Sequence, residues 1–157
     1  MKKILFIAIA ACLITTSCSK EMLKKHKASF FVNGVQCTGD ENTVGASFNI
    51  GNYNELVVDM MANDGSGKQV MLVIDVTKTV GQAVPFDTAT TQTFYTNDNT
   101  VTRYKPVSGE WIITGRKDGD NNDKYTEGTF NFVGVNQTNA TDTVRVTNGS
   151  FYVNKYN

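Results

Sequence analysis

Apolar and polar residues alternate in short segments along most of this chain from residue 28 onward. A period of two is typical of β-strands with one buried face, and no segment shows the sustained period of 3.6 that an amphipathic helix requires. The links between segments, such as Asn33-Gly34 and residues 63–67, are short and rich in Gly, Asn and Asp, as in antiparallel hairpins. The segments that alternate or are dense in strand-forming residues are 29–32, 45–50, 55–62, 69–76, 92–96, 110–116, 128–135 and 143–153.

This pattern predicts a single all-β antiparallel domain of about eight strands, either a β-sandwich or an up-and-down barrel. Residues 28–157 are enough for one hydrophobic core and too few for two domains of usual size. Because helical segments are lacking, parallel βαβ units are not expected.

The phase of the alternation indicates which side chains are buried. Leu56, Val58 and Met60 share one face of their segment, and Phe130 and Phe132 share one face of theirs. Residues 70–74 are apolar on both faces, which predicts a strand in the middle of a sheet with material packed on each side.

Two irregular regions are expected in the domain. Val146 and Phe151 lie in different phases of the last segment, and one extra residue at 148–149 restores the phase. This predicts a β-bulge, with a tight turn as the alternative. Pro85 and Pro106 fall in or beside a region expected to be irregular, residues 77–108, where prolines cost no central ladder bonds.

The first residues follow another pattern. Lys2 and Lys3 precede an apolar run over residues 4–14, and small residues at 15–17 lead to Cys18. These are the parts of a signal peptide, and the run is too short to span a bilayer. A cysteine at this position predicts a lipoprotein, because its thiolate can take a diacylglyceryl group before cleavage exposes its amine for acylation. Cys12 is a rival acceptor, and an ordinary cleaved signal with a free Cys18 is the other alternative.

The predicted organisation is a signal peptide over 1–17, lipidated Cys18 with a basic tether over 18–27, and the β domain over 28–157. Several acyl chains together make membrane attachment effectively permanent. The lysines of the tether suit an anionic bilayer surface. The β domain holds nine basic and fourteen acidic residues, so nucleic acid is not an expected partner.

The inventory of catalytic side chains is thin. His26 is the only histidine and falls in the tether, which excludes Ser-His-Asp, Cys-His and histidine-ligated zinc sites built within the β domain. Cys37 is the only cysteine after residue 18, so the domain has no disulfide, and we expect Cys37 to be buried. No catalytic residue, cofactor or metal site is predicted. Carboxylate pairs of the glycosidase kind remain conceivable among Glu55, Asp59, Asp75 and Glu110.

Several other residues are candidates for binding or modification. Tyr95 and Tyr104 are predicted to stack on a ligand such as a glycan, whereas Trp111 is expected in the core. Residues 118–123 resemble the first half of a calcium loop but lack its glycine and its closing glutamate, so a solvated hairpin loop is expected. Thr88 lies in an Asp-Thr-Ala triplet that resembles an O-glycosylation acceptor, and Thr143, in a similar triplet, is expected to begin a strand.

The segments 30–34, 128–132 and 144–151 together resemble a family of uncharacterised lipoproteins of Bacteroidota. The resemblance covers most of the β domain and implies an all-β fold without known catalytic residues. It also implies a place in the outer membrane of the cell envelope. In that phylum an acidic patch after the lipidated cysteine marks surface export, whereas residues 19–21 hold one acid beside a base, so the periplasmic leaflet is slightly favoured.

The sequence therefore predicts a membrane-tethered, extracytoplasmic, non-enzymatic binding domain whose ligand is a carbohydrate, a small molecule or a protein. The expected membrane partner is lipid, through acylated Cys18. A carboxylate-based hydrolase such as a glycosidase and a structural component of the envelope are the alternatives, and the oligomeric state stays open.

Overall fold

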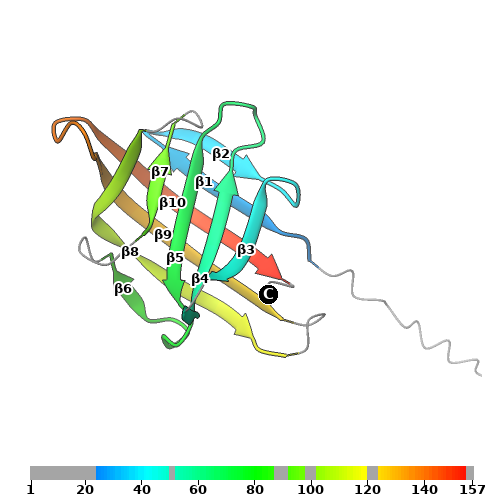
Figure 1. The fold of residues 1–157 in the computed structure, drawn as a ribbon. Helices are drawn as coiled ribbons and strands as arrows, with labels where there is room; N and C mark the ends of the chain where they lie inside the picture. Colours follow the sequence, from blue (N-terminus) through cyan, green and yellow to red (C-terminus); the bar gives the residue numbers. More distant parts are fainter. Residues whose placement is uncertain (1–23, 50–51, 87–91, 98–101, 120–123, 155–157) are drawn as a thin grey trace, which may run out of the picture.

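The computed structural model describes residues 24–49, 52–86, 92–97, 102–119 and 124–154. Its strands form one antiparallel sheet that curls into a nearly closed barrel, in the order β2-β1-β10-β9-β8-β7-β5-β4-β3, with β6 paired to β8 (Figure 1). The strands are β1 (Lys27–Val32), β2 (Val35–Gly39), β3 (Val44–Asn49), β4 (Asn52–Met61), β5 (Gln69–Asp75), β6 (Ala83–Pro85), β7 (Phe94–Thr96), β8 (Arg103–Lys117), β9 (Tyr125–Asn136) and β10 (Thr143–Asn154).

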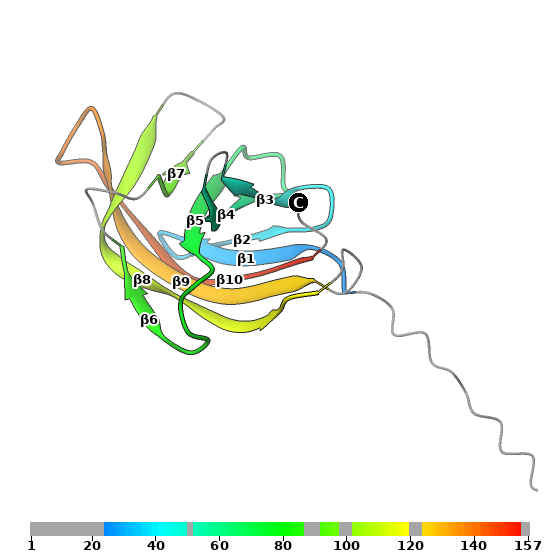
Figure 2. The same ribbon diagram turned by 60° about the horizontal axis from the view of Figure 1, so that its bottom comes forward.

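The all-β antiparallel prediction is confirmed, and of the two architectures considered the chain adopts the barrel. Figure 2 shows β1, β10, β9 and β8 as one curved layer whose concave side faces β3, β4 and β5. The first hairpin follows its sequence signal, because Asn33 and Gly34 both have positive φ, at 48° and 85°. A two-residue turn in which both central residues have positive φ matches the twist of the flanking strands.

The predicted bulge in the last segment is also confirmed. The register of β10 against β9 shifts between Val146 and Gly149, and Asn148 has a φ of 49°. Gly149 pairs with Phe130, and a Cβ atom at Gly149 would come within 2.6 Å of that phenyl ring. The bulge therefore brings glycine to the place where the backbone of β10 lies against a core ring.

The region expected to be irregular, 77–108, is partly regular, so that prediction was wrong in part. Strand β6 lies within this region and pairs with β8, and Pro85 is the last residue of β6. Strand β8 begins at Arg103, and Pro106 lies inside it, next to a register shift between Pro106 and Ser108. A bulge tolerates a residue that cannot donate to the ladder, which is why a proline inside a long strand misled the prediction.

The core follows the predicted phase. Leu56, Val58 and Met60 are fully buried, Phe130 and Phe132 are 2% exposed, and Trp111 is 5% exposed. Strand β5 lies between β4 and β7, as its apolar pattern predicted. Its inward side chains are fully buried, while Met71 and Val73 on the outer face are only half-buried.

The N-terminal edge of the domain lies earlier than the sequence predicted. Strand β1 begins at Lys27, and His26 contacts two other strands through both of its ring nitrogens. Residues 24–26 therefore lie against the barrel instead of forming a free tether. His26 is part of the folded domain.

Candidate functional site

A row of outward side chains, three of which carry hydroxyl groups, crosses the convex outer face of the barrel. Ser29 of β1 pairs with Ser150 of β10, Ser150 pairs with Thr129 of β9, and Thr129 pairs with Ile112 of β8. These positions alternate with the buried residues of the same strands, so their side chains point outward. The row runs across the strands and forms the floor of a shallow hollow, which we call the trench.

Larger polar side chains border the floor on both sides. On one side, Glu110 stands opposite Asn131. On the other side, Glu127 stands opposite Tyr152, and Tyr152 stands opposite Lys27. The trench is thus low in the middle and higher at its rims, because serine and threonine are flanked by residues with longer side chains.

Two hollows in the surface make up the trench. One has a volume of about 470 Å³ and the other about 400 Å³. Both are lined by Thr129 and Ser150, so they adjoin each other on the surface. Their combined length spans four strands, which suits an extended ligand better than a compact one. The residues that line the trench are Lys27, Ala28, Ser29, Glu110, Ile112, Thr114, Glu127, Gly128, Thr129, Phe130, Asn131, Thr147, Asn148, Gly149, Ser150, Phe151 and Tyr152.

The inner side of the sheet is closely packed beneath the floor of the trench. A Cβ atom at Gly128 would lie 2.5 Å from the carbonyl oxygen of Ile112 and 2.8 Å from the ring of Phe151. Glycine therefore lets Phe151 fill the inner side of the sheet while Thr129 and Ser150 line the outer side. The shape of the trench depends on this division between inner and outer side chains.

The chemistry of the trench is that of hydrogen bonding. Serine and threonine hydroxyls donate and accept, Asn131 does both through its amide, and Glu110 and Glu127 accept. Burial raises the pKa of Tyr152, and the negative charge of Glu127 raises it further. The Tyr152 hydroxyl therefore keeps its proton at neutral pH.

Aromatic rings cover one end of the trench. Tyr125 and Tyr152 stack with ring centroids 5.6 Å apart, and the Lys24 ammonium lies 5.4 Å from the centroid of the Tyr152 ring. Tyr152 is only 7% exposed, so its ring contacts protein more than solvent. This end of the trench is rigid and adjoins the N-terminal segment.

The tyrosines predicted to stack on a ligand lie elsewhere. The ring of Tyr95 is 1% exposed and packs against Tyr104, with centroids 5.7 Å apart. Tyr95 donates to Asn97 Oδ1 at 2.9 Å, and Tyr104 donates to Asp142 Oδ2 at 2.9 Å. Both rings therefore pack against each other and hydrogen-bond to the protein, away from the trench. Asp142 precedes Thr143, which begins β10 as expected.

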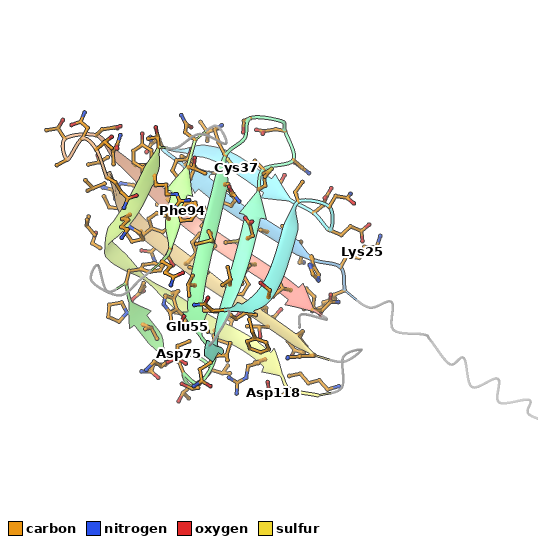
Figure 3. The ribbon with its side chains drawn as sticks, in the orientation of Figure 1. Lys25, Cys37, Glu55, Asp75, Phe94 and Asp118 are labelled. Carbon is orange, nitrogen blue, oxygen red and sulfur yellow. The ribbon has the colours of Figure 1, made fainter. Side chains whose placement is uncertain are left out.

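Two of the candidate carboxylates stand side by side. Glu55 and Asp75 face each other across β4 and β5, toward one end of the barrel (Figure 3). Burial raises the pKa of Asp75, but hydrogen bonds from Thr77 and the charge of Lys78 outweigh burial and lower it overall. A general acid needs a raised pKa, so Asp75 is poorly suited to that role. Asp59 accepts a hydrogen bond from Gln69 at 2.6 Å.

Other predicted positions have simpler outcomes. Cys37 is buried, as expected, and burial raises the pKa of its thiol (Figure 3). Asp118 forms an ion pair with Arg116 at 3.2 Å, while residues 120–123 of the same loop lie outside the described residues. Cys18 and Thr88 also lie outside them. Within the described ranges, histidine, cysteine and acidic side chains form no group of three that could hold a metal ion.

The trench itself was not predicted. Its signal in the sequence is the small polar residue at outward positions of three strands, Ser29, Thr129 and Ser150. These positions form a row only once the register of β1, β10 and β9 is known. Serine and threonine are common on the outer face of a sheet, so these residues do not indicate a binding site until the register of the strands is known.

No protein-family model, curated protein or solved structure matches this chain. In the part of the chain that the structure describes, no helix has the length and hydrophobicity of a membrane span.

Proposed function

We propose that this chain is a lipid-anchored domain of the cell envelope that binds an extended polyhydroxylated ligand, an oligosaccharide, and does not turn it over. The observation that carries the proposal is the trench, whose floor carries the hydroxyl groups of Ser29, Thr129 and Ser150 and whose rims carry carboxylates and an amide. Sugars present alternating donors and acceptors along their length, which such a surface can satisfy.

The anchor is part of the same proposal. Cys18 follows a signal-like segment and precedes the folded domain by few residues. From Cys18 to Lys24 the chain can reach about 20 Å when fully extended. An acylated Cys18 would therefore hold the barrel close to the bilayer, with the outer membrane and its periplasmic leaflet as the proposed location. Membership in the family of Bacteroidota lipoproteins belongs to this proposal too.

The positions of the acids favour binding over hydrolysis. Glu127 and Asn131 are four residues apart on β9, and Glu110 stands opposite Asn131. With a rise of about 3.3 Å per residue along β9 and about 4.8 Å between strands, the backbones at Glu110 and Glu127 lie about 14 Å apart. To reach the roughly 5 to 9.5 Å between the carboxyl groups of glycosidases, both glutamate side chains would have to lean toward each other along the sheet. The closer pair, Glu55 and Asp75, contains an acid whose pKa is lowered.

Ligand binding can be tested with a variant that fills the floor. Thr129→Arg places a long side chain where the two hollows meet, whereas Ser47→Arg places the same side chain at an exposed position of β3, away from the trench. On an array of neutral, acidic and amino oligosaccharides, we expect binding by the wild type and by Ser47→Arg, and at least a tenfold loss in Thr129→Arg, about 1.4 kcal/mol. Equal binding by both variants, or no binding to any glycan class, would contradict the proposal.

The anchor needs its own test. Cys18→Ala should abolish incorporation of radiolabelled fatty acid and release the protein from the membrane fraction of the native host. Cys12→Ala is the matched control and should keep the label. Unchanged labelling of Cys18→Ala would remove the anchor from the proposal and leave the trench untouched.

A further inference from the structure

The N-terminal segment bridges two strands of the barrel through the imidazole of His26. Nδ1 lies 3.0 Å from the carbonyl oxygen of Val44 at the start of β3, and Nε2 lies 2.7 Å from the carbonyl oxygen of Asn154 at the end of β10. Strands β3 and β10 are far apart in the sheet order and approach each other here. His26 therefore spans the place where the barrel is incompletely closed by its own ladder.

Both partners of the ring are backbone carbonyls, which only accept hydrogen bonds. A protonated imidazole carries N–H groups on both nitrogens and can donate to both oxygens. A neutral imidazole carries one N–H group and turns the lone pair of its other nitrogen toward a carbonyl oxygen. The geometry is thus fully satisfied only by the cationic ring.

The neighbouring contacts hold the same segment but are of other kinds. The Lys25 ammonium lies 2.7 Å from Glu41 Oε1 in the turn before β3 (Figure 3). The Lys24 ammonium lies over Tyr152 of β10, and the Asn154 side-chain amide donates to the Lys24 carbonyl.

The remaining charged groups nearby are few. Lys27 follows His26 at the start of β1, and Asp40 precedes Glu41 in the turn. Strand β3 itself contains no charged residue, and Lys155 lies outside the described residues. Of the side-chain types in this segment, imidazole is the one whose charge commonly changes near neutral pH.

We propose that His26 is a pH-responsive clasp that fastens residues 24–26 to β3 and β10 and loosens as the pH rises. Protonation adds the second hydrogen bond, and its loss replaces that bond with a contact between two acceptors. Opening would free residues 24–26 and remove the Lys24 ammonium from the ring of Tyr152, which lines one end of the trench. The clasp rests on the ring geometry alone and does not depend on the anchor or on a ligand.

The test compares the wild type with His26→Gln by thermal unfolding of the full chain in detergent at pH 5.5 and pH 8. His26 is the only histidine in the chain, so no other imidazole contributes. We expect the melting temperature of the wild type to fall by about 4 °C from the lower to the higher pH, relative to the change in His26→Gln. Glutamine can keep one contact but does not titrate in this range. The same pH dependence in both proteins would overturn the proposal.

A measurement on the wild type alone guards against a variant that fails to fold. In nitrogen-15 NMR spectra, the single imidazole should show two slowly exchanging N–H signals at pH 5.5 and one at pH 8. Protection of the amides at residues 25–27 from hydrogen exchange, corrected for intrinsic rates, should fall at least fivefold over the same change. Two unprotected ring nitrogens at pH 5.5 would contradict the clasp.

Discussion

Gly149 offers the sharpest test of the packing beneath the trench. Its missing side chain makes room for the ring of Phe130, since a Cβ atom would lie 2.6 Å from three atoms of that ring. Phe130 is 2% exposed and packs against the rings of Phe30 and Phe132, at centroid distances of 6.5 Å each, so it has little freedom to move. Gly149→Ala should therefore force overpacking.

Overpacking of a tight core costs about 1 to 3 kcal/mol. Alanine also restricts the unfolded chain, which stabilises by about 0.4 to 1 kcal/mol. Gly45→Ala on β3 is the matched control, because a Cβ atom there meets nothing within 4 Å. The control restricts the unfolded chain by the same amount but has no clash in the folded protein. The difference in stability between the two variants therefore measures the cost of the clash.

The assay is urea unfolding followed by the fluorescence of Trp111, the only tryptophan. We expect Gly149→Ala to be less stable than Gly45→Ala by about 1 to 3 kcal/mol, with Gly45→Ala within about 0.5 kcal/mol of the wild type or slightly more stable. In the double variant Gly149→Ala with Phe130→Leu, the smaller side chain should relieve part of the strain, so the two changes should cost less together than their sum. Equal stability of the two alanine variants, or strict additivity in the double variant, would refute the reasoning.

Three further predictions concern the core and the titrating groups. Phe132→Ala should lower the free energy of unfolding by about 3 to 5 kcal/mol, since the buried ring packs edge-on against Phe86 at 5.6 Å, and an unchanged urea midpoint would argue against this packing. In a chain with Cys12 and Cys18 replaced by serine, Cys37 should react with a thiol reagent at pH 7 far more slowly than in urea, because burial shields the thiol and raises its pKa; rapid reaction of the folded protein would contradict its burial. The lowered pKa of Asp75 means that its ionised form stabilises the fold above the unfolded pKa of about 3.9, and that this contribution is lost as the pH falls through the lower folded value. Unfolding of Asp75→Asn and wild type between pH 6 and pH 2.5 should therefore converge at the acid end, and parallel curves would count against the interaction.

Agreement between sequence and structure is best where the signal is local. The turn at Asn33-Gly34, the buried faces of β4 and β9 and the bulge before Gly149 all depend on a few neighbouring residues. Strands β2 and β6 were missed because only Cys37 and Gly39 of β2 are buried, and β6 is three residues long. The start of β8 was missed because Pro106 reads as a breaker until a bulge is known to accommodate it.

The contacts of His26 were missed for a different reason. Basic residues surround it in the sequence, so it was assigned to the tether. Its partners, Val44 and Asn154, are 18 and 128 residues away, and both contribute only backbone oxygen atoms. A backbone acceptor leaves no trace in the identity of a residue, so no inspection of the sequence could have found this contact.

The sequence by itself determined the all-β antiparallel fold and the main core residues, because alternation and turn chemistry are properties of neighbouring residues. The lipidation of Cys18 stays a prediction from the signal-like segment. Only the tertiary structure decided between sandwich and barrel, aligned Ser29, Ser150 and Thr129 into one floor, and placed His26 between β3 and β10. Closure and register depend on pairings between residues distant in the chain, and these are fixed by how all strands twist and pack together.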